Sequence, residues 1–201
     1  SKSDDIPKLP EDVEIIKQKY MSASSLQDYL ECPARFYFEK VKGLSVQDEV
    51  VDSLDFGMFG NAYHAAMQEL YAVQGGLLTG DYLKNLLKGK RVPEVVDRKI
   101  LEQLKTFELT GRNLIYSDMI CRYVYQTIRR DIELMKSEGV DHIRILGLEQ
   151  KKNMTIGGIK FFGIIDRLDS IREDVVRIVD YKTGKVSDSD FIINDDNAEA
   201  V

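Results

Sequence analysis

The stretch GIIDRLDSIREDVVRIVDYKTGK, from Gly163 to Lys185, decides the fold. Its apolar residues predict one strand, a turn at residues 172–174 and a second strand. The second strand is apolar until Asp180 and Lys182 interrupt it at its end. Because side chains at positions i and i+2 of a strand point to the same face, this carboxylate and this ammonium group are expected to project together.

The first strand of this hairpin is interrupted in the same way, since Asp166 follows the apolar run FFGII. If the two strands pair about the turn, Asp166 lies close to Asp180. Two carboxylates on one face repel each other unless a cation lies between them, and Mg²⁺ prefers such hard oxygen ligands. Lys182 beside them would orient or deprotonate a metal-bound water and stabilise negative charge on a phosphate oxygen. The alternative is a set of ordinary surface salt bridges at a strand end, which these residues alone leave open.

The rest of the chain changes from a helical to a strand-like period near Gly139. Helices are expected at residues 22–32, 33–43, 56–74, 81–89, 93–107 and 112–137, and strands at residues 143–156, 159–171 and 175–181. This order predicts an α/β domain with a small mixed sheet flanked by helices. We interpret residues 1–20 as a tail or arm, residues 21–201 as the domain and residues 77–140 as a helical insertion. The last residues, NAEAV, look like the first turn of an interrupted helix, so a C-terminal truncation is expected.

Composition sets few limits on function. The chain has 201 residues, of which 43% are hydrophobic and 31% charged, as in ordinary globular proteins. No apolar run approaches the length that spans a bilayer, and no secretory leader is present, so no membrane partner is expected. Cys32 and Cys121 lie far apart, which favours a reducing cytoplasm. The net charge of −6 is concentrated in residues 1–14 and 182–201, so it neither supports nor excludes a nucleic-acid partner.

The order of three motifs resembles a known family. Asp166, followed by DYKTG from Asp180, is similar to the signature of the PD-(D/E)xK nuclease superfamily, and more narrowly to the RecB-like and AddB-like nuclease domains of bacterial recombinational repair. SASSLQDYLECPARFYF, from Ser22, is similar to the opening SxSxLxxYxxCPxxFxF segment of those domains, and GMFGNAYHAAMQE, from Gly57, to their G-x-x-x-H helix. The resemblance covers about residues 22–185.

The resemblance implies a restriction-endonuclease-like core with a bound Mg²⁺ or Mn²⁺ ion. It implies Lys182 as the catalytic lysine and Glu149 as a catalytic acidic residue that contacts the metal or its water. The implied metal ligands are His64, Asp166, Asp180 and the backbone carbonyl of Tyr181. From the residues alone, a lone histidine such as His64 on a mostly apolar helix is more often a core or boundary residue than a ligand, and Glu149 could equally be the polar face of an edge strand.

The function implied by the resemblance is a divalent-metal-dependent DNA nuclease, the exonuclease part of a helicase–nuclease in double-strand break repair. Its partners would be DNA and a helicase domain or subunit. The alternative is an inactive nuclease-fold scaffold that binds DNA or a partner subunit, although scaffolds usually lose the lysine or the acidic pair.

Two features depart from the pattern of the family. The chain ends before the QxxxY helix that usually follows the lysine. Some relatives hold an iron–sulfur cluster with four cysteines, of which only Cys32 is matched, and this argues against a cluster in this chain. Cys32 is instead expected to be a small buried residue between helices.

Overall fold

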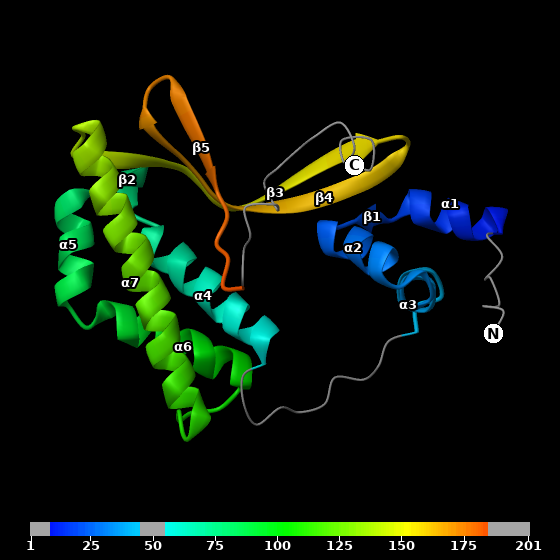
Figure 1. Cartoon of the computed structure of the whole chain (residues 1–201), viewed down its shortest axis with the longest axis horizontal. Helices are drawn as coiled ribbons and strands as arrows, with labels where there is room; N and C mark the ends of the chain where they lie inside the picture. The colour runs from blue at the N-terminus through cyan, green and yellow to red at the C-terminus, as the bar shows by residue number, and fades with distance from the viewer. Residues whose placement is uncertain (1–8, 45–54, 185–201) are drawn as a thin grey trace.

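The computed structural model describes residues 9–44 and 55–184. Figure 1 shows two groups of helices that are joined by a long, twisted β-hairpin. The helices of the first group are α1 (Pro10–Gln18), α2 (Ala23–Glu31), α3 (Pro33–Phe36) and the π-helix η1 (Tyr37–Val41). Those of the second group are α4 (Phe56–Tyr71), the 3₁₀ turn η2 (Gln74–Gly76), α5 (Gly80–Lys88), α6 (Arg91–Leu104) and α7 (Arg112–Glu138). None of these helices is long and apolar enough to cross a bilayer.

The sheet has five strands in the described residues and is built on one hairpin. The strands are β1 (Tyr20–Met21), β2 (Leu77–Thr79), β3 (His142–Ile156), β4 (Ile159–Arg172) and β5 (Val175–Val179). β3 and β4 pair antiparallel along nearly their whole length, and β2 pairs with the start of β3. On its other edge, β4 pairs in parallel with β1 near its start and antiparallel with β5 near its end. The predicted α/β fold, a small mixed sheet flanked by helices, is confirmed.

Local sequence signals explain where several of these elements begin and end. Ser22 caps α2 by accepting a hydrogen bond from the backbone N–H of Ser25, at 3.1 Å. Gly139 ends α7 in the left-handed conformation, at φ 68°. Gly157 and Gly158 connect β3 to β4, and both have positive φ, which a two-residue hairpin turn of this kind requires. These signals are short-range, and they fix the three strands and the helices close to their predicted bounds.

The larger of two cores lies between the second group of helices and the sheet. The buried apolar side chains come from α4 (such as Leu70), α6 (Val96), α7 (Ile128) and β3 (Ile143), and each of these four is 0% exposed. Tyr71 of α4 is also fully buried. α4 contacts both α6 and α7, so it lies at the centre of this group. This packing gives α4 a fixed position against β3 and β4.

A buried network of charges lies in the same core. The guanidinium of Arg167, which is 2% exposed, donates to both carboxylate oxygens of Asp131 on α7, at 2.7 and 3.0 Å. Its Nε lies 2.8 Å from the Asp169 carboxylate, although the angle is too poor for a hydrogen bond. Asp169 accepts two hydrogen bonds from Arg177 instead, and Asp131 accepts a third from the Tyr71 hydroxyl. Since each buried carboxylate has cationic partners, the sheet is joined to α7 by ionic contacts as well as by apolar packing.

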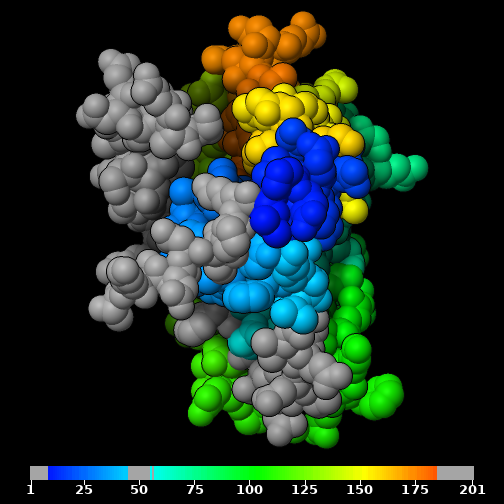
Figure 2. Space-filling view, turned by 90° about the vertical axis from the view of Figure 1, so that its right-hand side faces the viewer, coloured from blue at the N-terminus to red at the C-terminus, as the bar shows by residue number. Residues whose placement is uncertain are grey.

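A second, smaller core lies at the far end of the hairpin. Met21, Phe36 and Val41 form it, and Ile159 and Phe161 of β4 pack against it. In Figure 2 this end of the hairpin, in yellow, lies directly above α1, in blue. Residues 10–20 of the predicted arm therefore include α1 and the start of β1, while the division of the chain into arm, domain and insertion stays a prediction.

Cys32 corrects one expectation. It is exposed rather than buried between helices, and its sulfur accepts a hydrogen bond from the backbone N–H of Arg35 at 3.5 Å. It thus lies at the N-terminus of α3, whose first residue, Pro33, has no N–H to be satisfied.

Candidate functional site

Three side chains with metal-binding chemistry converge where α4 meets the hairpin. Nδ1 of His64 on α4 lies 3.2 Å from Asp166 Oδ1 on β4 and 3.9 Å from Glu149 Oε1 on β3. One potential ligand atom from each of the three lies within 4.8 Å of the others, and this is the only such group among the described residues. The structure thus brings together three of the residues that the sequence singled out.

The pairing of β3 with β4 explains why Glu149 faces Asp166. The pairs Leu148–Arg167 and Gln150–Ile165 lie on either side, which places the two carboxylates opposite each other across the hairpin. Glu149 has a left-handed backbone, at φ 48°, and it is one of only two described residues other than glycine with positive φ. A left-handed conformation costs a side-chain-bearing residue about 1–2 kcal/mol. This strain at the candidate site could not be found from the sequence, because nothing in LGLEQ marks a change of backbone conformation.

Asp166 is 7% exposed and its two oxygens have different partners. Oδ1 faces His64, whereas Oδ2 accepts a hydrogen bond from the backbone N–H of Tyr181, at 2.6 Å. Burial opposes ionisation of Asp166, but the hydrogen bonds from His64 and Tyr181 outweigh it and lower the pKa of the carboxyl. Asp166 is therefore held ionised, and it fixes the backbone that follows β5.

His64 and Glu149 respond to the same carboxylate. The hydrogen bond to Asp166 raises the pKa of His64 against the opposing effect of burial, and a backbone hydrogen bond to Tyr181 adds to the rise. Burial, followed by the negative charge of Asp166, raises the pKa of the Glu149 carboxyl. Two carboxylates that repel each other beside an imidazole form an environment that a cation would stabilise.

The donor set fits a divalent cation. One imidazole nitrogen and two carboxylate oxygens are ligands that Mg²⁺, Mn²⁺ and Zn²⁺ accept in proteins. Two oxygens on opposite sides of one Mg²⁺ ion are about 4.2 Å apart, from metal–oxygen distances of about 2.1 Å. Donor atoms within 4.8 Å of one another can therefore surround one ion after small side-chain movements. The donor chemistry alone does not choose between magnesium and manganese.

Asp180 and Lys182 lie beside this group but outside it. The last pair of β4 with β5 is Arg167–Val179, and Asp180 is the next residue along the chain. Asp180 forms an ion pair with Lys182 at 3.0 Å, and their side chains are 53% and 63% exposed. Lys182 is close enough for its charge to lower the pKa of Asp166. The roles of Asp180 as a ligand and of Lys182 as the catalytic lysine stay predictions.

A cavity of about 350 Å³ lies next to the end of the DYKTG motif. Phe59 of α4 contacts Tyr116 and Tyr123 of α7 edge-to-face in its wall, with both ring centroids at 6.0 Å. Thr183 and Gly184 complete the wall on the side of the motif.

Comparison with known proteins gives one family. The model of the PD-(D/E)XK nuclease superfamily matches residues 20–197. An uncharacterised protein of Rickettsia conorii is 24% identical over 195 residues, which cover 90% of this chain and 21% of that protein. An ATP-dependent helicase/deoxyribonuclease subunit of Clostridium novyi is 27% identical over 191 residues, which cover 88% of this chain and 16% of that protein.

The chain thus spans about a fifth, or less, of the length of these curated relatives. The match includes α4 with His64, the hairpin with Glu149 and Asp166, and the segment with Lys182. Because the family model covers most of the chain, and the fold is the mixed sheet flanked by helices that the motifs predicted, the chain belongs to the PD-(D/E)XK nuclease superfamily.

Proposed function

We propose that this chain is a divalent-metal-dependent DNA nuclease domain that hydrolyses phosphodiester bonds. The observation that carries the proposal is the convergence of His64, Glu149 and Asp166 from three elements onto one point beside the DYKTG segment. A site of this composition, with a lysine next to it, suits the cleavage of a negatively charged ester.

Each residue of the site would have a distinct role in binding the metal or its water. His64 and Asp166 would hold Mg²⁺ or Mn²⁺ together with the Tyr181 carbonyl, and Glu149 would contact the metal or a water next to it. The ion would supply a Lewis acid that lowers the pKa of water and draws charge from the phosphate. Asp166 would also position the backbone of Tyr181 through its hydrogen bond at 2.6 Å.

Lys182 and Asp180 would complete the site from the strand end. The exposed ammonium group of Lys182 can reach a bound phosphate and stabilise the charge that develops on its oxygens. Asp180 would leave its ion pair with Lys182 and join the ligands when DNA and metal bind. The exposure of both side chains supports this rearrangement, because few contacts oppose it.

The wider role rests on the similarity to the Clostridium novyi protein, whose name combines a helicase and a deoxyribonuclease. We infer that this chain is the exonuclease part of a larger helicase–nuclease that acts in double-strand break repair. Its partners would be DNA and a helicase domain or subunit. A cytoplasmic location fits the two free cysteines.

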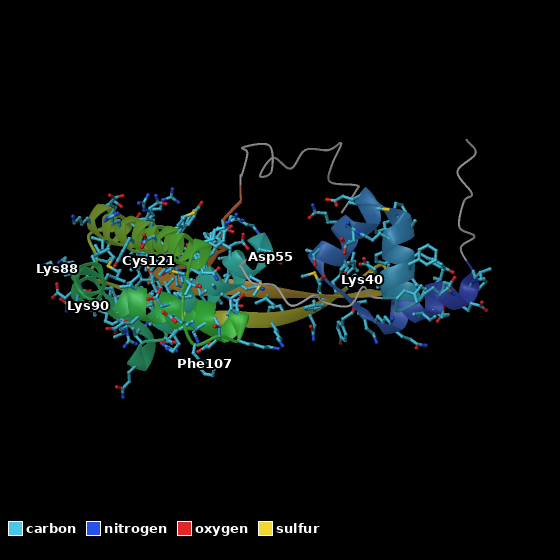
Figure 3. All side chains as sticks on the ribbon, turned by 90° about the horizontal axis from the view of Figure 1, so that it is seen from below. Lys40, Asp55, Lys88, Lys90, Phe107 and Cys121 are labelled. Carbon is cyan, nitrogen blue, oxygen red and sulfur yellow. The ribbon has the colours of Figure 1, made fainter. Side chains whose placement is uncertain are left out.

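The proposal is tested by cleavage of end-labelled linear and covalently closed circular DNA with Mg²⁺ or Mn²⁺. Lys182→Ala should abolish cleavage, leave the circular dichroism spectrum unchanged and leave DNA binding largely intact. Lys88→Ala is the matched control, since Lys88 is an exposed lysine that Figure 3 places at the outer end of the second group of helices. Cleavage of linear DNA alone would support the exonuclease role.

Calorimetry with Mn²⁺ separates metal binding from catalysis. Saturable binding that is lost in Asp166→Ala and in Asp180→Ala would support a metal between these strands. Binding that is lost only in Asp166→Ala would leave Asp180 without a ligand role. A folded chain that binds DNA but neither binds Mn²⁺ nor cuts DNA would instead favour the inactive scaffold.

A further inference from the structure

We propose that one face of the β3–β4 hairpin binds single-stranded DNA and leads it to the candidate metal site. This inference rests on the proposed function and deepens it by naming the form of the substrate. We call the surface the lysine face, and it consists of Lys151, Asn153 and Thr155 on β3 with Lys160, Phe162 and Ile164 on β4.

The pairing of the strands places these residues on one face. Opposite residues of an antiparallel pair project to the same side, and residues i and i+2 of one strand do so too. Lys151 is paired with Ile164, Asn153 with Phe162 and Thr155 with Lys160. The next alternate position along β4 is Asp166. The lysine face is therefore continuous with the face that carries the metal site.

The opposite face is covered on its β4 side, whereas Met154 and Ile156 of β3 are 57% and 48% exposed there. Ile159 and Phe161 point to it and pack against the small core of Met21, Phe36 and Val41. Met21 of β1 is paired with Phe161 and is buried, whereas Tyr20 is paired with Lys160 and is 52% exposed. Tyr20 therefore extends the lysine face by one strand.

The charge of this surface suits a polyanion. Between the metal site and the hairpin turn, the lysine face has two lysines and no acidic residue. Neither Lys151 nor Lys160 forms an ion pair with another described residue. Basic residues of the adjoining helices are neutralised, since Lys42 pairs with Asp12 and Arg35 with Asp28, at 2.8 and 2.6 Å. The ammonium groups of these two lysines can therefore form ion pairs with the phosphates of a nucleic acid.

The aromatic residues favour a single strand over a duplex. The Lys160 ammonium lies 5.8 Å from the centroid of the exposed Tyr20 ring, and half-buried Phe162 follows two residues along. Unpaired bases stack on such rings, whereas the bases of a duplex are already stacked on one another. From Asp166 to Lys160 the strand covers about 20 Å, at about 3.3 Å per residue, so several nucleotides can lie along it.

The test measures the affinity of the whole chain for a fluorescent single strand of about 12 nucleotides in metal-free buffer, where no cleavage occurs. Salt is varied between about 50 and 200 mM. Each lysine that neutralises a phosphate of a single strand contributes about 0.7 to the slope of log affinity against log salt. Lys151→Ala with Lys160→Ala should therefore lower the slope by about 1.4.

Three control variants separate this face from general electrostatics. Lys152→Ala removes the same charge from the opposite face of the same strand and should leave affinity and slope unchanged. Lys88→Ala with Lys90→Ala removes two exposed lysines at the far end of the molecule, where Figure 3 labels them, and should also have no effect. Tyr20→Ala should weaken binding roughly 5- to 150-fold, whereas Tyr20→Phe, which keeps the ring, should not.

The outcomes distinguish this inference from the proposed function. Equal slopes in wild type and the Lys151, Lys160 double variant would overturn the lysine face, even if the chain cuts DNA. The same would follow if the two lysines mattered for duplex but not for single-stranded DNA. Loss of cleavage in Lys182→Ala with retained lysine-dependent binding would support both proposals. A chain that binds no DNA would refute both.

Discussion

Arg167 offers the sharpest test of what holds the sheet to α7. Replacing it with Met keeps most of its volume but removes two hydrogen bonds to Asp131 and the ionic contact with Asp169. Asp131, which is 4% exposed, would still accept the hydrogen bond from the Tyr71 hydroxyl. The guanidinium of Arg177 would lie 3.8 Å from its carboxylate. Removing one partner of a buried ion pair costs about 3–5 kcal/mol, because the other charge stays buried without compensation.

This cost has a measurable thermal equivalent. In a chain of this size, each kcal/mol lowers the melting temperature by about 2–4 °C. Arg167→Met should thus lower it by roughly 6–20 °C in scanning calorimetry. Arg98→Met is the matched control, since Arg98 also forms a forked pair, with Glu69 at 2.5 and 3.0 Å, but its side chain is 49% exposed. Its melting temperature should fall by no more than about 4 °C, because an exposed pair is screened by water and contributes about 1 kcal/mol or less.

A double variant tests the reason for the loss. Asp131→Asn removes the charge that Arg167→Met leaves unpaired and keeps an acceptor for the Tyr71 hydroxyl. The double variant should therefore melt at a higher temperature than Arg167→Met alone. If Arg167→Met shifts the melting temperature no more than Arg98→Met, or if the double variant is less stable than the single one, the buried charge is not the origin of the effect.

Three other predictions follow from single residues. Burial raises the pKa of the Cys121 thiol to about 11, so a chromogenic disulfide reagent at pH 8 should label only exposed Cys32 quickly, and two rapid thiols in the native chain would contradict this. Glu149→Gly should be more stable than Glu149→Ala by about 1 kcal/mol in urea unfolding, because glycine adopts the left-handed conformation without a Cβ penalty, whereas equal stabilities would mean that no strain is stored there. The hydrogen bond from Arg98 lowers the pKa of Glu69 below its ordinary value of 4.5, so this pair stabilises the fold above that pH and loses its effect as the pH falls through the lowered value. Glu69→Gln should hence have a lower urea midpoint than the wild type at pH 7 but not at pH 2, and a difference that persisted in acid would rule out the ionic explanation.

The sequence predicted those parts of the molecule that depend on short-range patterns. Alternation of apolar residues gave the three strands after Gly139, and the turn at residues 172–174 let β4 pair with β5 as far as Arg167 and Val179, the neighbours of Asp166 and Asp180. The family motifs also brought His64 to Asp166, although helix α4 and strand β4 are far apart in the chain. Periodicity alone could not have joined them, because it says which face of an element is buried and not which element covers it.

Long-range contacts account for what was missed. Asp131 lies in a charged stretch of α7, RRDIE, which predicts a solvent-exposed face. In the structure it is buried, because it pairs with Arg167 of β4 in the core. The polar segment before Tyr20 carries no strong helical period, yet α1 forms there because a small core lies beside it. Asp180 and Lys182 form an ion pair because positions i and i+2 of a strand share one face. Whether either side chain turns toward a metal depends on the bound metal and DNA, and the periodicity of the sequence carries no information about these.

The β3–β4 hairpin connects two cores of very different size, and this difference has a consequence for motion. Near Asp166 its backbone belongs to a large packed body, whereas near the glycine turn the described residues that support it include only three buried apolar side chains, Met21, Phe36 and Val41. The free energy of local opening should therefore fall along a single strand, from nearly the global value at one end to much less at the other. Amide hydrogen exchange along β4 would display this gradient residue by residue. A single strand bound along the lysine face, as proposed above, would contact both the compliant and the rigid end, so the hairpin could follow the shape of the strand without disturbing the geometry of the metal ligands.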